Sequence, residues 1–151
     1  MRFEGKKVIV ASGYFDPLHI GHVEYLKLAR MLGDMLVVIV NNDKQAALKK
    51  GKSFMSENDR WRLVGELKCV DIPVLSIDDG ASVSDTIQML VDKGFNPAIF
   101  AKGGDRFSNE IPEAQVCKKH NIQIVDGLGD KIRSSSELIS NAYESRLQVC
   151  A

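Results

Sequence analysis

The sequence lacks long hydrophobic runs and lacks an excess of charge of either sign. No apolar stretch approaches the roughly 20 residues of a membrane span, and residues 1–7 do not contain the apolar core of a secretion signal. Twenty Lys and Arg balance twenty Asp and Glu, so no overall field favours nucleic acid or an anionic surface. We therefore expect a cytoplasmic protein that binds neither nucleic acid nor membranes.

Cysteine is scarce, and two familiar motifs are missing. Cys69, Cys117 and Cys150 are odd in number and far apart, which excludes a disulfide framework and a cysteine-based zinc site. The first Gly-rich turn lacks the Gly-x-Gly-x-x-Gly pattern, so an NAD-binding domain is disfavoured. The chain of 151 residues is 44% hydrophobic, which fits a single domain over residues 1–151.

Apolar runs rich in β-branched residues alternate with helical patterns along the chain. Such runs suit strands that are buried on both faces, as in a parallel sheet covered by helices. The sequence therefore predicts an α/β fold with three layers around a central five-stranded, mainly parallel sheet. Ser56 and Ser82, each followed three residues later by Asp, predict two helix N-caps. The five runs cover residues 8–11, 36–40, 72–77, 98–101 and 122–125.

Ligands of parallel α/β sheets bind at the carboxyl ends of the strands. This rule selects the loops at residues 13–21, 43–55, 102–108 and 127–133. We expect the binding site to lie among these four loops, because they also hold most of the unusual side chains of the chain.

The first of these loops runs from Gly13 to His22 and joins a predicted strand to a predicted helix. Such a turn favours a phosphate, because unpaired N–H groups and the helix dipole point outward there. His19 and His22 are three residues apart and can face one spot, where they could stabilise charge moving on a phosphate. Gly21 between them suits close approach of a ligand. The alternative is a pair of capping or surface histidines.

Four segments together resemble the nucleotidylyltransferase superfamily with the His-x-Gly-His signature, in particular its cytidylyltransferase-like branch. The resemblance implies a Rossmann-like sandwich that transfers a nucleotidyl group to a phosphomonoester and releases pyrophosphate. It implies Mg²⁺ held mainly by the nucleotide phosphates, no metal site made of protein side chains, and a homodimer. The segments are Gly13 to His22, Lys49 to Phe54, Lys102 to Asp105 and Ile132 to Ser136.

The resemblance also assigns roles to single residues. It implies that His19, His22 and Lys52 are catalytic, with the histidines at the α-phosphate and Lys52 on the triphosphate. Arg60 follows a predicted helix cap, and we expect it to be a fourth catalytic residue whose planar guanidinium reaches the triphosphate. The residues implied in nucleotide binding are Gly13, Tyr14, Phe15, Gly21, Gly104, Asp105, Ser134, Ser135 and Ser136. The residues implied in substrate binding are Asp16, Lys50 and Lys102, with Lys50 on the acceptor phosphate.

Each cationic or acidic position also has a structural interpretation. The lysine segment could be a solvated basic loop, and Arg60 could pair with Glu57 or Glu66. Asp16 could hold the first loop together through backbone N–H groups, or position a metal or the acceptor. Asp105 could simply stabilise a turn.

Two pairs of nucleotide donor and phosphate acceptor are compatible with the sequence. The lysine segment and the His-x-Gly-His surroundings favour CTP and glycerol phosphate or another small phosphomonoester. The match of Lys102 to Asp105 with heptose-phosphate adenylyltransferases favours ATP with a sugar phosphate as the alternative. A binding module without turnover is the alternative from another functional class.

Overall fold

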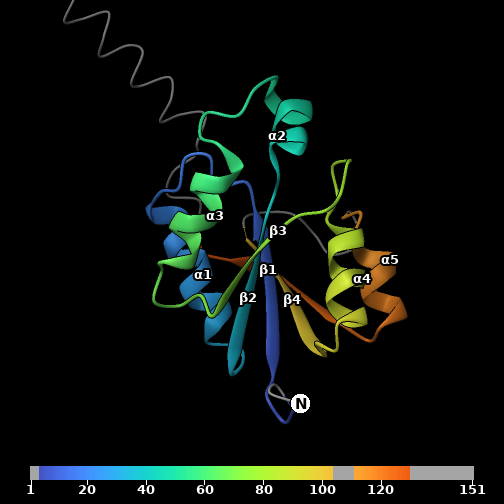
Figure 1. Cartoon of the computed structure of the whole chain (residues 1–151). Helices are drawn as coiled ribbons and strands as arrows, with labels where there is room; N and C mark the ends of the chain where they lie inside the picture. The colour runs from blue at the N-terminus through green and yellow to red at the C-terminus, as the bar shows by residue number, and fades with distance from the viewer. Residues whose placement is uncertain (1–3, 104–110, 130–151) are drawn as a thin grey trace, which may run out of the picture.

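The computed structural model describes residues 4–103 and 111–129 of the chain (Figure 1). Five strands form one sheet in the order β3-β2-β1-β4-β5, and all four pairings are parallel. The predicted α/β fold with a five-stranded parallel sheet is thereby confirmed. The strands are β1 (Val8–Gly13), β2 (Met35–Val40), β3 (Ile72–Leu75), β4 (Pro97–Gly103) and β5 (Gln123–Leu128).

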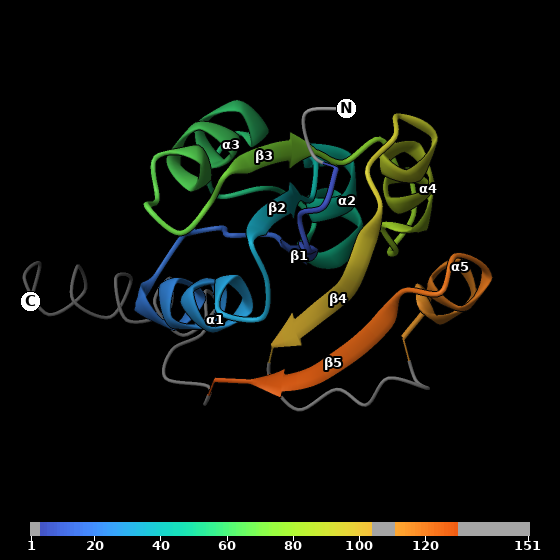
Figure 2. The same ribbon diagram turned by 90° about the horizontal axis from the view of Figure 1, so that it is seen from below.

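Helices cover both faces of this sheet, as Figure 2 shows. Residues of α1 and α3 pack with one face of the strands in a first hydrophobic cluster, which includes Leu26 and Val64. Residues of α4 and α5 pack on the other face in a second cluster, which includes Leu90 and Cys117. The helices are α1 (Ile20–Arg30), α2 (Asp43–Lys50), α3 (Glu57–Gly65), α4 (Ser84–Asp92) and α5 (Ala114–Lys119).

The central strands are buried on both faces, which is why their sequences predicted them as strands. All six residues of β2 are buried, and alternate residues belong to the two clusters, with Leu36 in the first and Val37 in the second. A strand buried on both faces must be apolar throughout. No helix in residues 4–103 and 111–129 is long and apolar enough to cross a membrane.

One of the two predicted helix caps is confirmed. Ser56 is the N-cap of α3, and its Oγ accepts a hydrogen bond from the Asp59 N–H at 3.3 Å. The prediction for Ser82 is wrong, because α4 has Val83 at its N-cap position and no side-chain cap. The Ser82 hydroxyl accepts from the Ser84 N–H at 3.3 Å, whereas the next two N–H groups donate to the Asp78 carboxylate, from Asp85 at 2.9 Å and from Thr86 at 3.0 Å.

The predicted loop at residues 43–55 begins with a helix, which the sequence analysis missed. Asn42 caps α2 by accepting from the Gln45 N–H at 2.9 Å, and the Gln45 side chain accepts from the Asn42 N–H at 3.1 Å. This reciprocal capping box fixes the first turn of α2. Lys50 therefore ends a helix, and only residues after it form the loop that leads to α3. Figure 1 shows α2 beyond the carboxyl ends of the strands.

Candidate active site

The turn from β1 to α1 is built around the buried ring of Phe15. A Cβ atom on Gly13 would lie 2.8 Å from the Cζ atom of Phe15, so only glycine lets this ring fold under the end of β1. Phe15 itself has a φ of 52° and is 1% exposed. Its ring contacts the His22 ring edge-on, with centroids 5.0 Å apart. The Phe15 ring therefore packs against the histidines inside the protein, and a nucleotide contact of this residue, which would involve its backbone, stays a prediction.

The two histidines cap their own helix and stack on each other. His19 is the N-cap of α1, and its Nδ1 accepts from the Gly21 N–H at 3.1 Å. The His22 Nδ1 accepts from the His19 N–H at 3.2 Å. The ring centroids lie 3.7 Å apart at an interplanar angle of 23°. The capping alternative is thus correct for Nδ1, and it assigns the proton of each neutral ring to Nε2.

His22 is held in its neutral form. Desolvation is the largest cause that lowers its pKa from 6.5 to about 3, and the repulsion that a protonated His22 ring would meet from His19 and Lys49 acts in the same direction. A neutral imidazole that accepts at Nδ1 is a hydrogen-bond donor at Nε2 over the whole physiological range. His22 can therefore donate to a phosphate oxygen without first gaining a proton.

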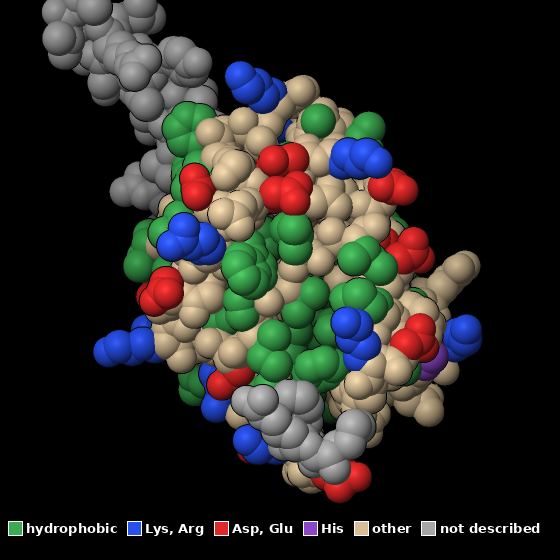
Figure 3. Space-filling model, viewed as in Figure 1, with side chains coloured by type: hydrophobic (Ala, Val, Ile, Leu, Met, Phe, Trp, Pro, Cys, Tyr) green, Lys and Arg blue, Asp and Glu red, His purple; other side chains and the backbone are tan. Residues whose placement is uncertain are grey.

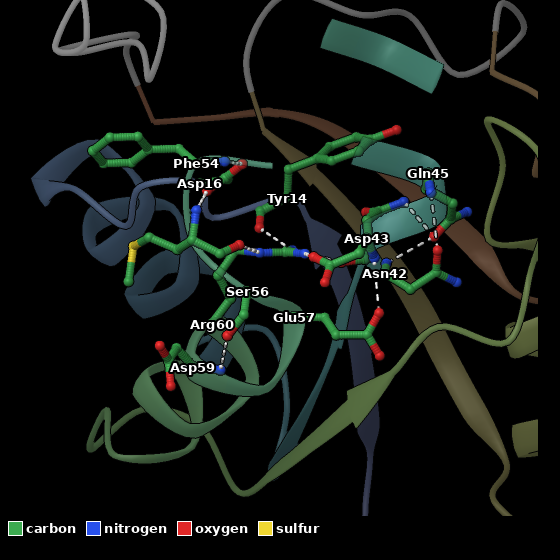
Figure 4. A network of polar contacts seen from close by, with 12 residues as sticks. Tyr14, Asp16, Asn42, Asp43, Gln45, Phe54, Ser56, Glu57, Asp59 and Arg60 are labelled. Atoms are coloured by element: carbon green, nitrogen blue, oxygen red, sulfur yellow. Dashed lines mark hydrogen bonds and ion pairs between the residues drawn. The ribbon is translucent and has the colours of Figure 1, made fainter. Parts of the chain in front are cut away.

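Asp16 joins the histidine turn to the segment that follows α2. Its two carboxylate oxygens accept from the N–H groups of Phe54 at 2.8 Å and Met55 at 2.6 Å. The Nζ of Lys50 lies 2.9 Å from the Asp16 carboxylate and donates to the Asp16 carbonyl at 2.8 Å. Figure 4 shows the Asp16 contact with Phe54.

The electrostatics of Asp16 agree with this structural role. Burial acts to raise the pKa of its carboxyl group, but the hydrogen bonds from Lys50, Phe54 and Met55 outweigh burial and bring the pKa below its usual 3.8. The side chain is fully buried. Of the two alternatives for Asp16, the structure supports the one in which it holds the first loop in place.

Arg60 lies in the interior and does not project toward a phosphate site. Its side chain is fully buried, and its guanidinium donates to the carbonyls of Met55 at 2.9 Å, Tyr14 at 2.9 Å and Asn41 at 2.6 Å. Its ion pair is formed with Asp43 at 2.8 Å (Figure 4). The predicted pairing with Glu57 or Glu66 is therefore wrong, and the predicted contact with the triphosphate is not supported, because the donors already bind the protein.

The structure describes three further predicted residues, Tyr14, Lys52 and Lys102. Tyr14 lies under Lys49, whose Nζ is 4.4 Å from the ring centroid. Lys52 is exposed in the loop after α2. Lys102 lies near the end of β4, with its Nζ 5.2 Å from the Phe100 ring centroid. Gly104, Asp105, Ser134, Ser135 and Ser136 lie outside the described residues.

Sequence reasoning missed the side chains that complete the Arg60 network. Asn41 provides a carbonyl for the guanidinium, and its side chain donates to Gln45 at 3.1 Å. Asp43 also ties α2 to α3, because its N–H donates to the Glu57 carboxylate at 2.9 Å. The Asn42-x-x-Gln45 spacing was the available signal, since it matches a capping box just after a buried strand.

No group of three or more His, Cys, Asp or Glu side chains converges on a metal position within residues 4–103 and 111–129. The Asp16 carboxylate, which lies closest in sequence to the histidines, is occupied by Lys50 and two N–H groups. The described residues therefore supply no carboxylate cage for a metal ion.

Two surface hollows flank α3, and neither is lined by His19 or His22. One of about 300 Å³ is lined by Met55, Asp59, Arg62, Leu63 and Glu66. The other, of about 430 Å³, is lined by Glu57, Asn58, Trp61, Pro73, Val74 and Leu75. Figure 3 shows acidic and basic side chains interspersed with hydrophobic ones on this face. The face therefore has no single-sign charge that would attract a triphosphate.

Comparison with known proteins identifies the family. The sequence family described as Cytidylyltransferase-like matches residues 10–140. The chain belongs to this family. It is therefore a nucleotidyltransferase, and the histidine turn is where the family resemblance and the geometry coincide.

Individual relatives refine this placement. The chain is 36% identical over 148 residues to the "Bifunctional protein HldE" of Citrifermentans bemidjiense, covering 93% of this chain and 28% of the relative. It is 38% identical to the protein of the same name from Streptomyces coelicolor, covering 95% of this chain and 30% of the relative. The chain thus spans less than a third of the length of these curated relatives.

Two solved structures share the fold. A "lipopolysaccharide core biosynthesis protein" from Thermoplasma volcanium matches with a TM-score of 0.66 and 32% identity, covering 83% of this chain and 98% of the other. A NadR protein in complex with NAD and AMP-PNP matches with a TM-score of 0.54 and 17% identity, covering 85% of this chain and 39% of the other. The second likeness shows only the fold.

Proposed function

We propose that the protein transfers an adenylyl group from ATP to a sugar phosphate and releases pyrophosphate. The relatives named HldE and the resemblance of Lys102 to Asp105 to heptose-phosphate adenylyltransferases support this pair of substrates. A structural relative is named as a lipopolysaccharide core biosynthesis protein, which agrees with a sugar acceptor. These likenesses favour ATP and a sugar phosphate over CTP and glycerol phosphate.

The single observation that carries the chemistry is the orientation of the two imidazoles. Both Nδ1 atoms accept from backbone N–H groups at the start of α1, so both neutral rings carry their proton on Nε2. Two donors fixed in this way need no reorganisation when charge develops on a phosphate, which is the condition for strong electrostatic catalysis. The stacking of the rings at 3.7 Å places both donors at one location.

The proposed reaction is a direct displacement at phosphorus. An oxygen of the sugar phosphate attacks the α-phosphorus of ATP, a new P–O bond forms, and the bond from the α-phosphorus to the bridging oxygen breaks. The electron pair of that bond leaves with pyrophosphate. A phosphomonoester has a second pKa near 6 and is largely dianionic at neutral pH, so the attacking oxygen needs no general base. His19 and His22 stabilise the charge that grows on the α-phosphate and the bridging oxygen.

The lysine segment is proposed to hold the outer phosphates. Lys52 is exposed and can turn toward the triphosphate as a flexible point charge. Lys50 is tied to Asp16, so binding of the acceptor phosphate requires an exchange of this ion pair for a contact with the substrate. Mg²⁺ enters with the triphosphate, and no residue of the described chain is assigned to it.

The test is a matrix of triphosphates and acceptors read by pyrophosphate release. We expect release with ATP and a heptose or hexose phosphate, weaker release with CTP, and none without an acceptor. The His22→Ala variant serves as the inactive control, and the His120→Ala variant, changed at the end of α5, serves as the active one. Release with CTP and glycerol phosphate alone would reverse the substrate assignment. Nucleotide binding without release in any combination would indicate a binding module.

A further inference from the structure

The carboxyl end of β5 is irregular, in a way that brings one acidic residue to the edge of the sheet. In the register of β4 and β5, Ala101 pairs with Val125 and Gly103 pairs with Leu128. Two residues of β5, Asp126 and Gly127, therefore lie opposite the single residue Lys102 of β4. Gly127 has a φ of 70°, so the extra residue takes a conformation that glycine adopts without strain. Such bulges re-aim side chains and are frequent beside functional sites.

The Asp126 side chain has an unsatisfied acceptor at this position. Its Oδ1 is shielded from solvent and, within the part of the chain that the structure describes, is the one buried side-chain oxygen or nitrogen without a hydrogen-bond partner. The buried carboxylates of Asp16, Asp78 and Glu113 all accept hydrogen bonds from backbone N–H groups. Leaving a buried acceptor unpaired costs free energy. Unlike those three residues, Asp126 as a whole is only half-buried, so its carboxylate borders the surface and an external donor can satisfy it.

We propose that Asp126 is a nucleoside-recognition residue whose carboxylate accepts a hydrogen bond from a ribose hydroxyl of the triphosphate. This inference rests on the proposed function. Phosphate groups offer only acceptors to a carboxylate and are repelled by it, whereas a ribose hydroxyl is a donor. An acidic side chain near a strand end of a parallel sheet holds a ribose hydroxyl in dinucleotide-binding α/β folds.

The sheet order separates this position from the acceptor side. Lys50 and Lys52 follow β2, the histidines follow β1, and Asp126 lies on β5, beyond β4. A substrate that extends along the carboxyl edge from the histidines can therefore place its acceptor phosphate toward β2 and its nucleoside toward β4 and β5. Asp126 lies opposite Lys102 at the nucleoside end of this line. A hydroxyl of the acceptor sugar is the other possible donor, and the experiment separates the two.

The experiment is calorimetric titration with ATP, 2′-deoxy-ATP and 3′-deoxy-ATP, in the presence of Mg²⁺ and without an acceptor. We expect the wild-type chain to bind ATP at least about tenfold more tightly than one of the deoxy analogues, the ratio of one hydrogen bond to a charged group. The Asp126→Ala variant should bind ATP and that analogue within about twofold of each other. Asp92→Asn, at the exposed end of α4, is the matched control and should keep the wild-type ratio.

Asp126→Asn provides a second readout because it keeps the shape of the side chain but weakens the acceptor. It should give an intermediate ratio, and its thermal midpoint without ligand should equal or exceed that of the wild type, since an orphan charge is removed. An unchanged preference for ATP in Asp126→Ala would overturn the inference, as would a change confined to the Michaelis constant of the acceptor sugar phosphate. Failure of the wild type to bind any triphosphate would instead overturn the proposed function.

Discussion

The histidine turn and the Arg60 network use strong hydrogen-bonding groups in opposite ways. At the turn, the Nδ1 atoms of His19 and His22 accept from backbone N–H groups, so each neutral ring carries its proton on Nε2. In the network, the fully buried guanidinium of Arg60 donates to three carbonyls and one carboxylate. The difference teaches that a phosphate-binding residue type is not sufficient evidence of phosphate binding. What matters is whether its donors remain available after folding.

The two regions nevertheless depend on each other. The Tyr14 carbonyl that receives Arg60 lies in the turn that leads to the histidines, and Met55, whose carbonyl also receives Arg60, donates its N–H to Asp16. Arg60 thus fixes the backbone on both sides of the candidate site. The predictions below separate this supporting role from the chemical role of the histidines.

Replacement of Arg60 should have the largest effect, and the effect should be on stability. Arg60→Leu leaves the Asp43 carboxylate and three carbonyls without their donor, so we expect a loss of about 3 to 5 kcal/mol in the free energy of unfolding. Urea unfolding followed by circular dichroism measures it. Arg62→Leu changes an exposed arginine on the same helix and should cost less than about 0.5 kcal/mol. If Arg60→Leu is as stable as Arg62→Leu but binds ATP poorly, Arg60 is a ligand of the triphosphate after all.

Replacement of the histidines should give the reverse pattern. His19→Ala and His22→Ala each remove a fixed donor, so we expect turnover to fall by roughly 10²- to 10³-fold, with nucleotide affinity within a few-fold of the wild type. Initial rates of pyrophosphate release and calorimetric titration measure the two quantities. Both variants also lose part of the α1 cap, which should cost about 1 kcal/mol. Unchanged turnover in both variants would remove the histidines from the mechanism.

The two lysines should differ in which Michaelis constant they change. Lys52→Ala should raise the constant for ATP about tenfold, the ratio of one charge-assisted contact, and should leave stability unchanged because the residue is exposed. Lys50→Ala should raise the constant for the sugar phosphate and should also lower stability, since Lys50 is bonded to Asp16. Lys44→Ala, which breaks an exposed ion pair with Asp79, is the control. An effect of Lys50→Ala on ATP alone would show that the two roles are exchanged.

The sheet could be predicted because strands that are buried on both faces consist of consecutive apolar residues. The six apolar residues of β2 are all buried, and a local pattern of this kind needs no knowledge of distant contacts. The boundaries of α2 and α4 could not be predicted in the same way. The first turn of α4 is capped by the Asp78 carboxylate, which lies seven and eight residues before the N–H groups that it receives. The Lys-rich sequence of α2 has no apolar face, so only the Asn42-x-x-Gln45 capping box marks where this helix begins.

The same distinction applies to the candidate site. The capping spacing of His19 and His22 is local, so their position at the start of α1 followed from the sequence. The Arg60 guanidinium is held inside the protein by Tyr14, Asn41 and Asp43, which lie 17 to 46 residues away in the sequence. Asp126 lies at the register shift between β4 and β5, and its Oδ1 has no hydrogen-bond partner. Such long-range arrangements become visible only once the chain is folded.

A further expected effect concerns pH and the His22 ring. Its pKa is near 6.5 in the unfolded chain and about 3 in the folded protein, because desolvation and the charges of His19 and Lys49 disfavour the protonated ring. Between these values the unfolded chain binds a proton that the folded protein does not, so the free energy of unfolding should fall as the pH falls from 6.5 toward 3. The lowered pKa of Asp16 also makes stability fall in acid, but that loss develops only as the pH approaches the unfolded value of about 3.9. Urea midpoints at pH 7.5, 6.0 and 4.5 measure the effect.

His22→Asn, whose Oδ1 can replace Nδ1 as the acceptor of the His19 N–H, should show a shallower decline than the wild type. Equal slopes in the two proteins would mean that His22 gains its proton in the folded state, and the site would then present a cation to the α-phosphate at low pH.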